Sequence, residues 1–135
     1  MIEEDISSRT LDAFFQVYNE VGDGFLEGLY QRCLVVALRE RGLRVETELP
    51  LSIQYRGARV GEYRLDVLVE RRVIIECKAG DRLHLAHEYQ LLNYLRATGL
   101  TLGFLFNFGP SPSFKRLANT HRDPSQRKLT TVWKR

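Results

Sequence analysis

The sequence predicts an α/β domain in which helices flank a mixed β-sheet, and two observations carry this prediction. Apolar residues recur at helical spacing in three segments, whereas four other segments alternate with the period of a strand or form short apolar runs. These segments follow the order helix, helix, strand, strand, strand, helix, strand, with short connections and no internal repeat. At 135 residues, the chain has room for one domain of this kind.

Two helices are expected first. In residues 7–21, apolar side chains such as Leu11 and Phe14 recur every three or four positions, and Gly22 and Gly24 interrupt the pattern. A second helix is expected from about residue 25 to residue 41, since Gly42 is well placed to end it.

The rest of the chain supplies the predicted sheet and a third helix. The expected strands are residues 45–55, 60–69, 73–79 and 101–108, and the helix is 83–98, closed by Gly99. After Gly109, the prolines at positions 110, 112 and 124 favour a mostly irregular segment. We therefore expect one domain over residues 1–118 and a basic C-terminal tail over residues 119–135.

Charge is distributed unevenly along the chain. The whole sequence carries 20 basic and 17 acidic residues, a net charge of +3. From residue 110 to residue 135 there are seven Lys or Arg residues and one acidic residue, which gives +6 and leaves −3 for the remainder. Such a segment is typical of a surface that binds a polyanion such as nucleic acid, although a solvated chain end has the same composition.

Composition disfavours several classes of protein. The longest apolar run, Cys33–Leu38, is too short to span a membrane, and the acidic start lacks the apolar region of a secretory signal. Two cysteines cannot form a disulfide framework, so a reducing, cytoplasmic compartment is expected. A zinc site on His84 and His87 is disfavoured, because three histidines and two scattered cysteines do not assemble four ligands.

The residues that carry chemistry lie on the hairpin predicted at 60–79. If residues 70–72 form its connection, Asp66 falls directly opposite Glu76, with about 4.5–5.5 Å between their Cβ atoms. A two-residue connection would place the two acids on opposite faces of the sheet, so the register decides whether they meet.

Two carboxylates at so short a distance repel each other and resist joint ionisation unless a cation lies between them. Lys78 lies on the same face as Glu76 and supplies one positive charge. A divalent ion would supply more, and carboxylates, waters and substrate phosphate are the ligands that Mg²⁺ prefers. This set of residues is typical of metal-assisted phosphodiester hydrolysis, in which a lysine orients the water or stabilises developing charge.

Each of these residues also has a structural interpretation. The acids and Lys78 could form a surface ladder of salt bridges, although Ile74 on the same face favours a half-buried setting. On the helix at 83–98, Gln90, Tyr94 and His87 share a side that could line a cleft or form a satisfied polar flank. Glu27 falls in the first turn of the second helix, where the macrodipole favours a carboxylate.

Several motifs in combination resemble the GxxExxY protein family, which is grouped with the PD-(D/E)XK nuclease-like superfamily. The motifs are Gly24-x-x-Glu27-x-x-Tyr30, Gly61-Glu62-Tyr63-Arg64-x-Asp66, Glu76-x-Lys78-Ala79, His87-Glu88-x-Gln90-Leu91-Leu92-Asn93-Tyr94-Leu95 and Asn107-Phe108-Gly109, and they cover about residues 5–118. The resemblance implies a restriction-endonuclease-like fold with an αβββαβ core. The sequence departs from the superfamily pattern at Leu65, where a proline is common.

The resemblance also implies roles for individual residues. Asp66, Glu76 and Lys78 correspond to the acids and the lysine that hold Mg²⁺ and organise hydrolysis, with the carbonyl of Cys77 as a backbone ligand. Glu27 would complete the site through water. The substrate-binding residues implied on the last helix are Gln90 and Tyr94, and we place His87 with them.

Two functions remain open at this stage. The first is a Mg²⁺-dependent nuclease, with Mn²⁺ as an alternative ion. The second is an interaction module that keeps the fold but has little turnover, in which the basic tail and Trp133 contact the phosphates and bases of a nucleic acid. Because the domain is small, a homodimer or a partner protein is expected for a long substrate.

Overall fold

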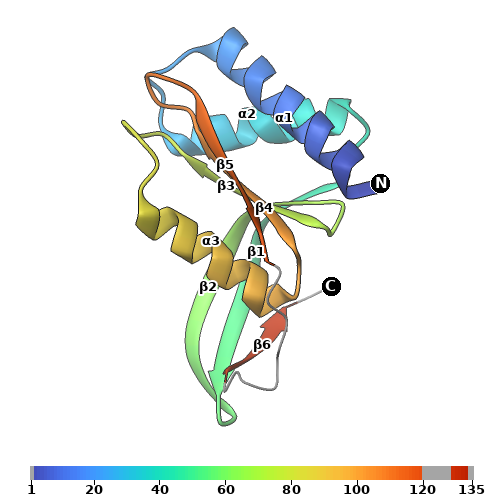
Figure 1. The fold of residues 1–135 in the computed structure, drawn as a ribbon, viewed down its shortest axis with the longest axis vertical. Helices are drawn as coiled ribbons and strands as arrows, with labels where there is room; N and C mark the ends of the chain where they lie inside the picture. The colour runs from blue at the N-terminus through green and yellow to red at the C-terminus, as the bar shows by residue number, and fades with distance from the viewer. Residues whose placement is uncertain (1, 120–128, 134–135) are drawn as a thin grey trace.

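A mixed β-sheet forms the centre of the protein, and helices cover both of its faces (Figure 1). The structure, a computed structural model, describes residues 2–119 and 129–133. In these residues the helices are α1 (Ile2–Val21), α2 (Glu27–Glu40) and α3 (Leu85–Thr98). The strands are β1 (Val45–Tyr55), β2 (Ala58–Val69), β3 (Val73–Lys78), β4 (Leu102–Asn107), β5 (Ser113–Ala118) and β6 (Leu129–Trp133).

The strand order is β5-β4-β3-β2-β1-β6. The β3–β4 pair is parallel and the other neighbouring pairs are antiparallel. The parallel pair is connected through α3, as a parallel crossover requires. The predicted mixed sheet flanked by helices is therefore confirmed.

Each face of the sheet buries its own apolar core. Ile75 and Phe104 pack with α1 and α2 on one face, whereas their chain neighbours Ile74 and Leu105 pack with α3 on the other. Successive residues of β3 and β4 thus alternate between two cores, which explains why these strands are almost continuously apolar. Glu76 interrupts the apolar run on the α3 side of β3, at a position that is 3% exposed.

Two strands that the sequence did not predict extend the sheet at its edges. β5 pairs with β4, and β6 pairs with β1, so for the described residues after Gly109 the expectation of a mostly irregular segment is wrong. The side chains of β5 are nearly all exposed, which leaves no apolar alternation to reveal this edge strand. The boundary between a domain at 1–118 and a tail at 119–135 stays a prediction, because residues 120–128 and 134–135 lie outside the described residues.

The helix starts differ from the predicted positions for local reasons. α1 begins at Ile2 rather than residue 7, and its first turn carries three acids that stabilise a helix N-terminus. α2 begins at Glu27 rather than residue 25, because Gly24 adopts a φ of 106° and Leu26 is extended. None of the helices in the described ranges is both long enough and apolar enough to cross a membrane.

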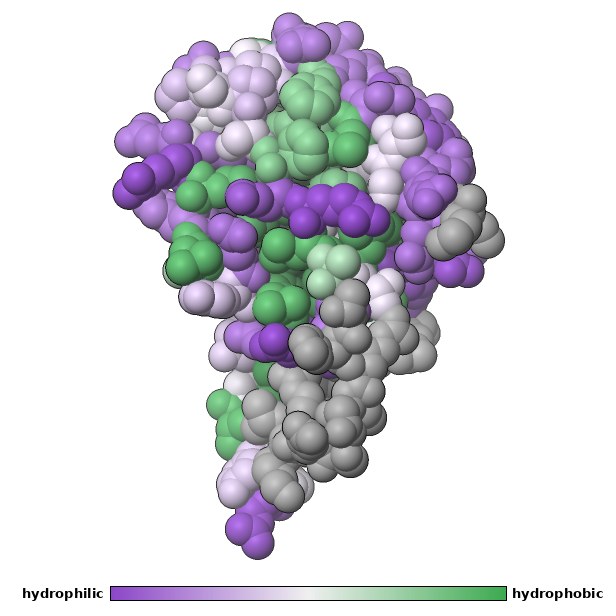
Figure 2. Space-filling model, viewed as in Figure 1, coloured by the Kyte–Doolittle hydropathy of each residue, from purple (hydrophilic) through white to green (hydrophobic). Residues whose placement is uncertain are grey.

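The β1–β2 hairpin extends well past the helices at the lower end of the view in Figure 1. In the space-filling view this part of the molecule narrows away from the body and ends in a hydrophilic tip (Figure 2). The register of the hairpin shifts between Ile53 and Gln54, which is typical of a β-bulge. The hairpin therefore presents side chains beyond the layered body of the domain.

Candidate active site

Asp66 and Glu76 lie where β2 and β3 separate. The ladder between these strands ends at the pair formed by Val67 and Ile75, and residues 70–72 connect the strands. Continuing the same register by one residue places Asp66 opposite Glu76. The three-residue connection, on which the predicted meeting of the two acids depended, is therefore confirmed.

The connection holds this register without a glycine. Glu70 and Arg71 both adopt left-handed backbone angles, with φ values of 52° and 55°. Such angles are strained for residues with side chains, so contacts elsewhere must hold them. Arg71 forms an ion pair with Glu46 at 2.6 Å, and the Glu70 carboxylate accepts a hydrogen bond from the backbone of Arg44. Both partners lie at the start of β1, which explains why the turn alone did not reveal the register.

Where the pairing of β2 and β3 ends, the two carboxyl groups accept hydrogen bonds from backbone N–H groups that no longer bond to the neighbouring strand. The backbone N–H of Asp66 donates to Oε1 of Glu76 at 3.4 Å, and the backbone N–H of Cys77 donates to Oδ2 of Asp66 at 3.1 Å. Each acid is thus held against the strand that carries the other. The arrangement keeps the backbone hydrogen-bonded at the point where the strands open.

The burial of Glu76 controls its charge. Desolvation by burial, followed by the charge of Asp66 and a side-chain hydrogen bond to it, raises the pKa of Glu76 to about 9. The backbone N–H of Asp66 and the charge of Lys78 act in the opposite direction but are smaller effects. In the absence of a cation, Glu76 therefore keeps its proton at neutral pH.

Glu27 and Lys78 lie within electrostatic range of the two acids. Desolvation by the surrounding protein raises the pKa of Glu27, while the charge of Lys78 lowers it and the charge of Asp66 raises it. The structure thus brings together Glu27, Asp66, Glu76 and Lys78, which we call the carboxylate–lysine cluster. The catalytic roles of these four residues stay predictions.

The loop before α2 fixes the position of Glu27. Gly24 has a φ of 106°, which only glycine adopts readily. The hydroxyl of the buried Tyr30 donates to the carbonyl of Gly22 at 2.5 Å and accepts from the backbone N–H of Phe25 at 3.2 Å. The spacing Gly24-x-x-Glu27-x-x-Tyr30 therefore has a local reason, because its first and last residues shape the turn that presents the acid.

The end of β3, which carries Lys78, is fixed by a clamp that the sequence analysis did not assign. The buried side chain of Asn107 accepts a hydrogen bond from the backbone N–H of Gly80 and donates to its carbonyl, both at 3.0 Å. The N–H of Phe108 donates to the carbonyl of Lys78 at 2.8 Å. A Cβ atom at Gly109 would come within 1.8 Å of the Gly80 carbonyl oxygen, so glycine is required there. An asparagine closing an apolar strand just before glycine was the available signal.

α3 contributes Gln90 and Tyr94 from the face of the sheet on which Glu76 lies. The side-chain amide of Gln90 donates to the Tyr94 hydroxyl at 3.1 Å. Burial, followed by the charges of Glu76 and Asp66, raises the pKa of Tyr94 to about 12. The Tyr94 hydroxyl therefore keeps its proton at neutral pH, and this proton is available to a ligand near the two acids.

His87 has a structural role that the sequence analysis did not foresee. Its Nδ1 accepts a hydrogen bond from the backbone N–H of His84 at 3.3 Å, which caps the start of α3. Burial, followed by the charge of Lys78 and that of His84, lowers the pKa of His87. Its proximity to Lys78 keeps it beside the cluster, and its contact with substrate stays a prediction.

The donor set suits a hard divalent cation. The thiol of Cys77 is buried in the core formed with α1 and α2, and burial raises its pKa, whereas the backbone N–H of Cys77 contacts the Asp66 carboxylate. In the part of the chain that the structure describes, no group of three or more His, Cys, Asp or Glu side chains is arranged to hold a metal ion. An ion at Asp66 and Glu76 would therefore take its other ligands from a backbone carbonyl, water and substrate, which is how Mg²⁺ is commonly held. The proton retained by Glu76 marks a place where added positive charge is favourable.

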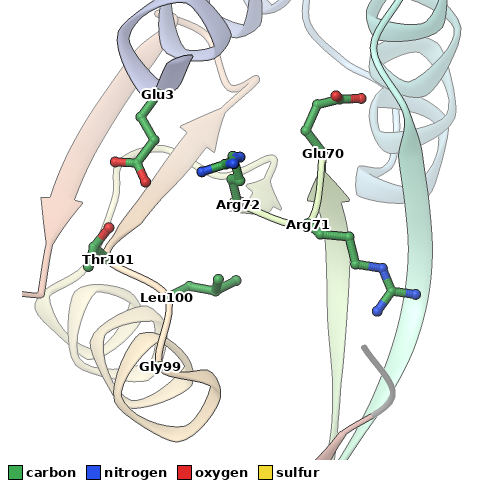
Figure 3. A pocket seen from close by; sticks show the side chains of 7 residues that line it. All are labelled: Glu3, Glu70, Arg71, Arg72, Gly99, Leu100 and Thr101. Atoms are coloured by element: carbon green, nitrogen blue, oxygen red, sulfur yellow. The ribbon is translucent and has the colours of Figure 1, made fainter. Parts of the chain in front are cut away.

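A separate cavity of about 300 Å³ lies at the other end of β3 (Figure 3). It is lined by Glu3, Glu70, Arg71, Arg72, Gly99, Leu100 and Thr101. Arg72 directly precedes β3, whereas Glu76 and Lys78 are among the last three residues of that strand. The cavity therefore contains none of the predicted site residues.

Comparison with solved structures relates the fold to that of SSO0001. The two chains are 20% identical with a TM-score of 0.55, and the match covers 73% of this chain and 52% of SSO0001. The chain thus spans about half the length of SSO0001, and at this identity the likeness concerns the fold alone. No match is found among the curated proteins.

The family comparison covers nearly all of the layered domain. The family model described as the PD-(D/E)XK nuclease superfamily matches residues 4–117. This range contains α2, α3, the first four strands and all but the first two residues of α1, and it includes the whole carboxylate–lysine cluster. The restriction-endonuclease-like α/β fold is thereby confirmed, and the chain belongs to the PD-(D/E)XK nuclease superfamily.

Proposed function

We propose that the protein is a Mg²⁺-dependent nuclease that hydrolyses phosphodiester bonds in nucleic acid, with Mn²⁺ as an alternative ion, and that it belongs to the GxxExxY group of its superfamily. The observation that carries this proposal is the pairing of Asp66 with the buried, proton-retaining Glu76 where two strands open. Perturbed carboxyl groups beside a lysine are typical of sites that perform chemistry.

The proposed roles follow from position and chemistry. Asp66 and Glu76, with the carbonyl of Cys77, would hold the ion, which when bound supplies positive charge that polarises phosphate and acidifies water. Lys78 orients the attacking water or stabilises the charge that develops on phosphate. Glu27 accepts a proton or a hydrogen bond from water at the edge of the cluster. Gln90, Tyr94 and His87 contact the substrate from α3.

A binding module with little turnover is the second candidate. Its support is the basic composition of residues 110–135, which include seven Lys or Arg residues and one acidic residue. We propose nucleic acid as the partner in both cases, with a homodimer or a partner protein for long substrates. Cys33 and Cys77 are both free thiols, which fits the reducing cytoplasm proposed from composition.

A cleavage assay with matched variants separates the two candidates. The protein is incubated with supercoiled plasmid and with single-stranded DNA, each with Mg²⁺, Mn²⁺ or a chelator, and binding is measured in parallel by fluorescence anisotropy. The test variants are Glu76→Gln and Lys78→Ala, and the controls are Glu40→Gln and Arg96→Ala at exposed positions on α2 and α3. We expect metal-dependent cleavage that is lost in both test variants and retained in both controls. Binding without cleavage, unchanged in all variants, would favour the binding module.

A further inference from the structure

Tyr63 projects from β2, three residues before Asp66, with 44% of its surface exposed. Its ring contacts that of Tyr94, with 5.8 Å between the ring centroids and 58° between the ring planes. Its edge lies over Gly61, where a Cβ atom would come within 3.0 Å of Cε2 of Tyr63. The absence of a side chain at Gly61 therefore leaves room for the ring.

These contacts hold the ring in place before any ligand binds. Tyr94 and the backbone of Gly61 support it, while nearly half of the side chain faces solvent. A ring that is already positioned loses little conformational freedom when it stacks on a ligand. Its exposure is too large for a core residue, so packing alone does not account for an aromatic side chain here.

Tyr63 is linked to the carboxylate–lysine cluster through Tyr94. The charges of Glu76 and Asp66 act on the Tyr94 hydroxyl, and the ring of Tyr63 packs against the ring of Tyr94. An aromatic face thus adjoins the place where the proposed chemistry occurs.

We propose that Tyr63 is a stacking platform for an unpaired base next to the phosphate that is cleaved, so that the preferred substrate is single-stranded nucleic acid. This inference rests on the proposed nuclease function. In a duplex, both faces of an internal base are covered by its neighbours, so an exposed ring has no free base face to contact. In a single strand, each base offers a π-face on which an aromatic side chain stacks.

The test measures binding and cleavage separately. Anisotropy of labelled oligonucleotides of one sequence, single-stranded and duplex, gives Kd in the presence of chelator, and cleavage is measured with Mg²⁺. The variants are Tyr63→Leu, which keeps an apolar side chain without a ring, and Tyr63→Phe, which keeps the ring. Tyr55→Leu is the matched control, because Tyr55 is 42% exposed on the same hairpin but lies near its tip. Melting temperatures show that each variant is folded.

We expect the single strand to bind more tightly than the duplex. Tyr63→Leu should weaken single-strand binding about tenfold and leave duplex binding unchanged, while Tyr63→Phe and Tyr55→Leu stay near the wild-type value. Equal binding of the two substrates, no binding at all, or a Tyr63→Leu variant with wild-type single-strand affinity would overturn the inference. Single-strand binding through Tyr63 without cleavage would instead contradict the nuclease proposal, which makes the two failures distinguishable.

Discussion

Asp66 and Glu76 each accept a hydrogen bond from the backbone of the strand that carries the other. This exchange occurs directly after the last ladder pair of β2 and β3. The carboxyl groups therefore join the opening strands and also face each other, which couples the local fold to the charge of the site. Removing the charge should consequently affect both stability and chemistry.

Glu76→Gln should stabilise the metal-free protein at neutral and alkaline pH. Because the pKa of Glu76 is about 9 when folded and near 4.5 when unfolded, the folded state binds the extra proton between these values. Stability then falls as pH rises through this window. Glutamine mimics the protonated acid. We therefore expect the free energy of unfolding of the variant at pH 8 to exceed that of the wild type by about 1 kcal/mol or more, which corresponds to a rise of several degrees in Tm.

Thermal unfolding in chelator at pH 5, 7 and 9 checks this expectation. The difference in Tm between Glu76→Gln and the wild type should grow with pH. The exposed variant Glu40→Gln serves as the reference for loss of a carboxylate that has no buried partner. A Tm difference that is constant across this range would contradict a raised pKa at Glu76.

Added Mg²⁺ should raise the Tm of the wild type at pH 8 but not that of Glu76→Gln. An ion that binds only the folded state stabilises it by an amount that grows with the logarithm of ion concentration. The wild type presents two acids to the ion, whereas the variant presents Asp66 alone. The measurement is Tm across a Mg²⁺ titration, repeated with Mn²⁺, and equal shifts in both proteins would argue against a shared site on the two acids.

Asn107→Ala should lower both stability and cleavage. The change removes the two part-buried hydrogen bonds between the Asn107 side chain and the backbone of Gly80, which together contribute about 1–3 kcal/mol. Because the same turn fixes Lys78, we expect the cleavage rate to fall by more than the loss of folded protein explains. Urea denaturation and kcat/KM measured on the folded fraction test this. Asn93→Ala, on the exposed side of α3, is the control, and a wild-type kcat/KM in Asn107→Ala would contradict the positioning role.

Tyr30→Phe should separate the packing of Tyr30 from its hydrogen bonds. The ring stacks on Phe108 with 4.7 Å between centroids, and phenylalanine keeps this contact while losing the bonds to Gly22 and Phe25. We expect a loss of about 1 kcal/mol in stability, since each bond contributes modestly. If the loop positions Glu27, kcat/KM of the folded variant should also fall, by several-fold. Unchanged kcat/KM would show that the geometry of this loop does not matter for turnover.

The sequence was informative about the features that depend on residues close together in the chain, such as the alternation of side chains along a strand. The alternation of β2 and β3 placed Asp66, Glu76 and Lys78 correctly relative to one another once the connection had three residues. The connection itself was ambiguous, because its left-handed residues are held by the start of β1 rather than by a glycine.

The features that the sequence did not reveal depend on distant contacts. β5 carries exposed side chains and is a strand because β4 offers an edge to pair with. The Asn107 clamp joins two segments 27 residues apart. Tyr63 belonged to a recognised motif, but its contact with Tyr94 of α3 is visible only in the fold.

The most direct test of the role proposed for the carboxylate–lysine cluster is the single-turnover cleavage rate of Asp66→Asn in Mg²⁺. Asparagine keeps an oxygen that can accept the N–H of Cys77 but removes the negative charge, so the variant should fold. The proposed function predicts a rate at least about 100-fold below the wild type, with single-strand affinity retained. A cleavage rate equal to that of the wild type would contradict the assignment of the site.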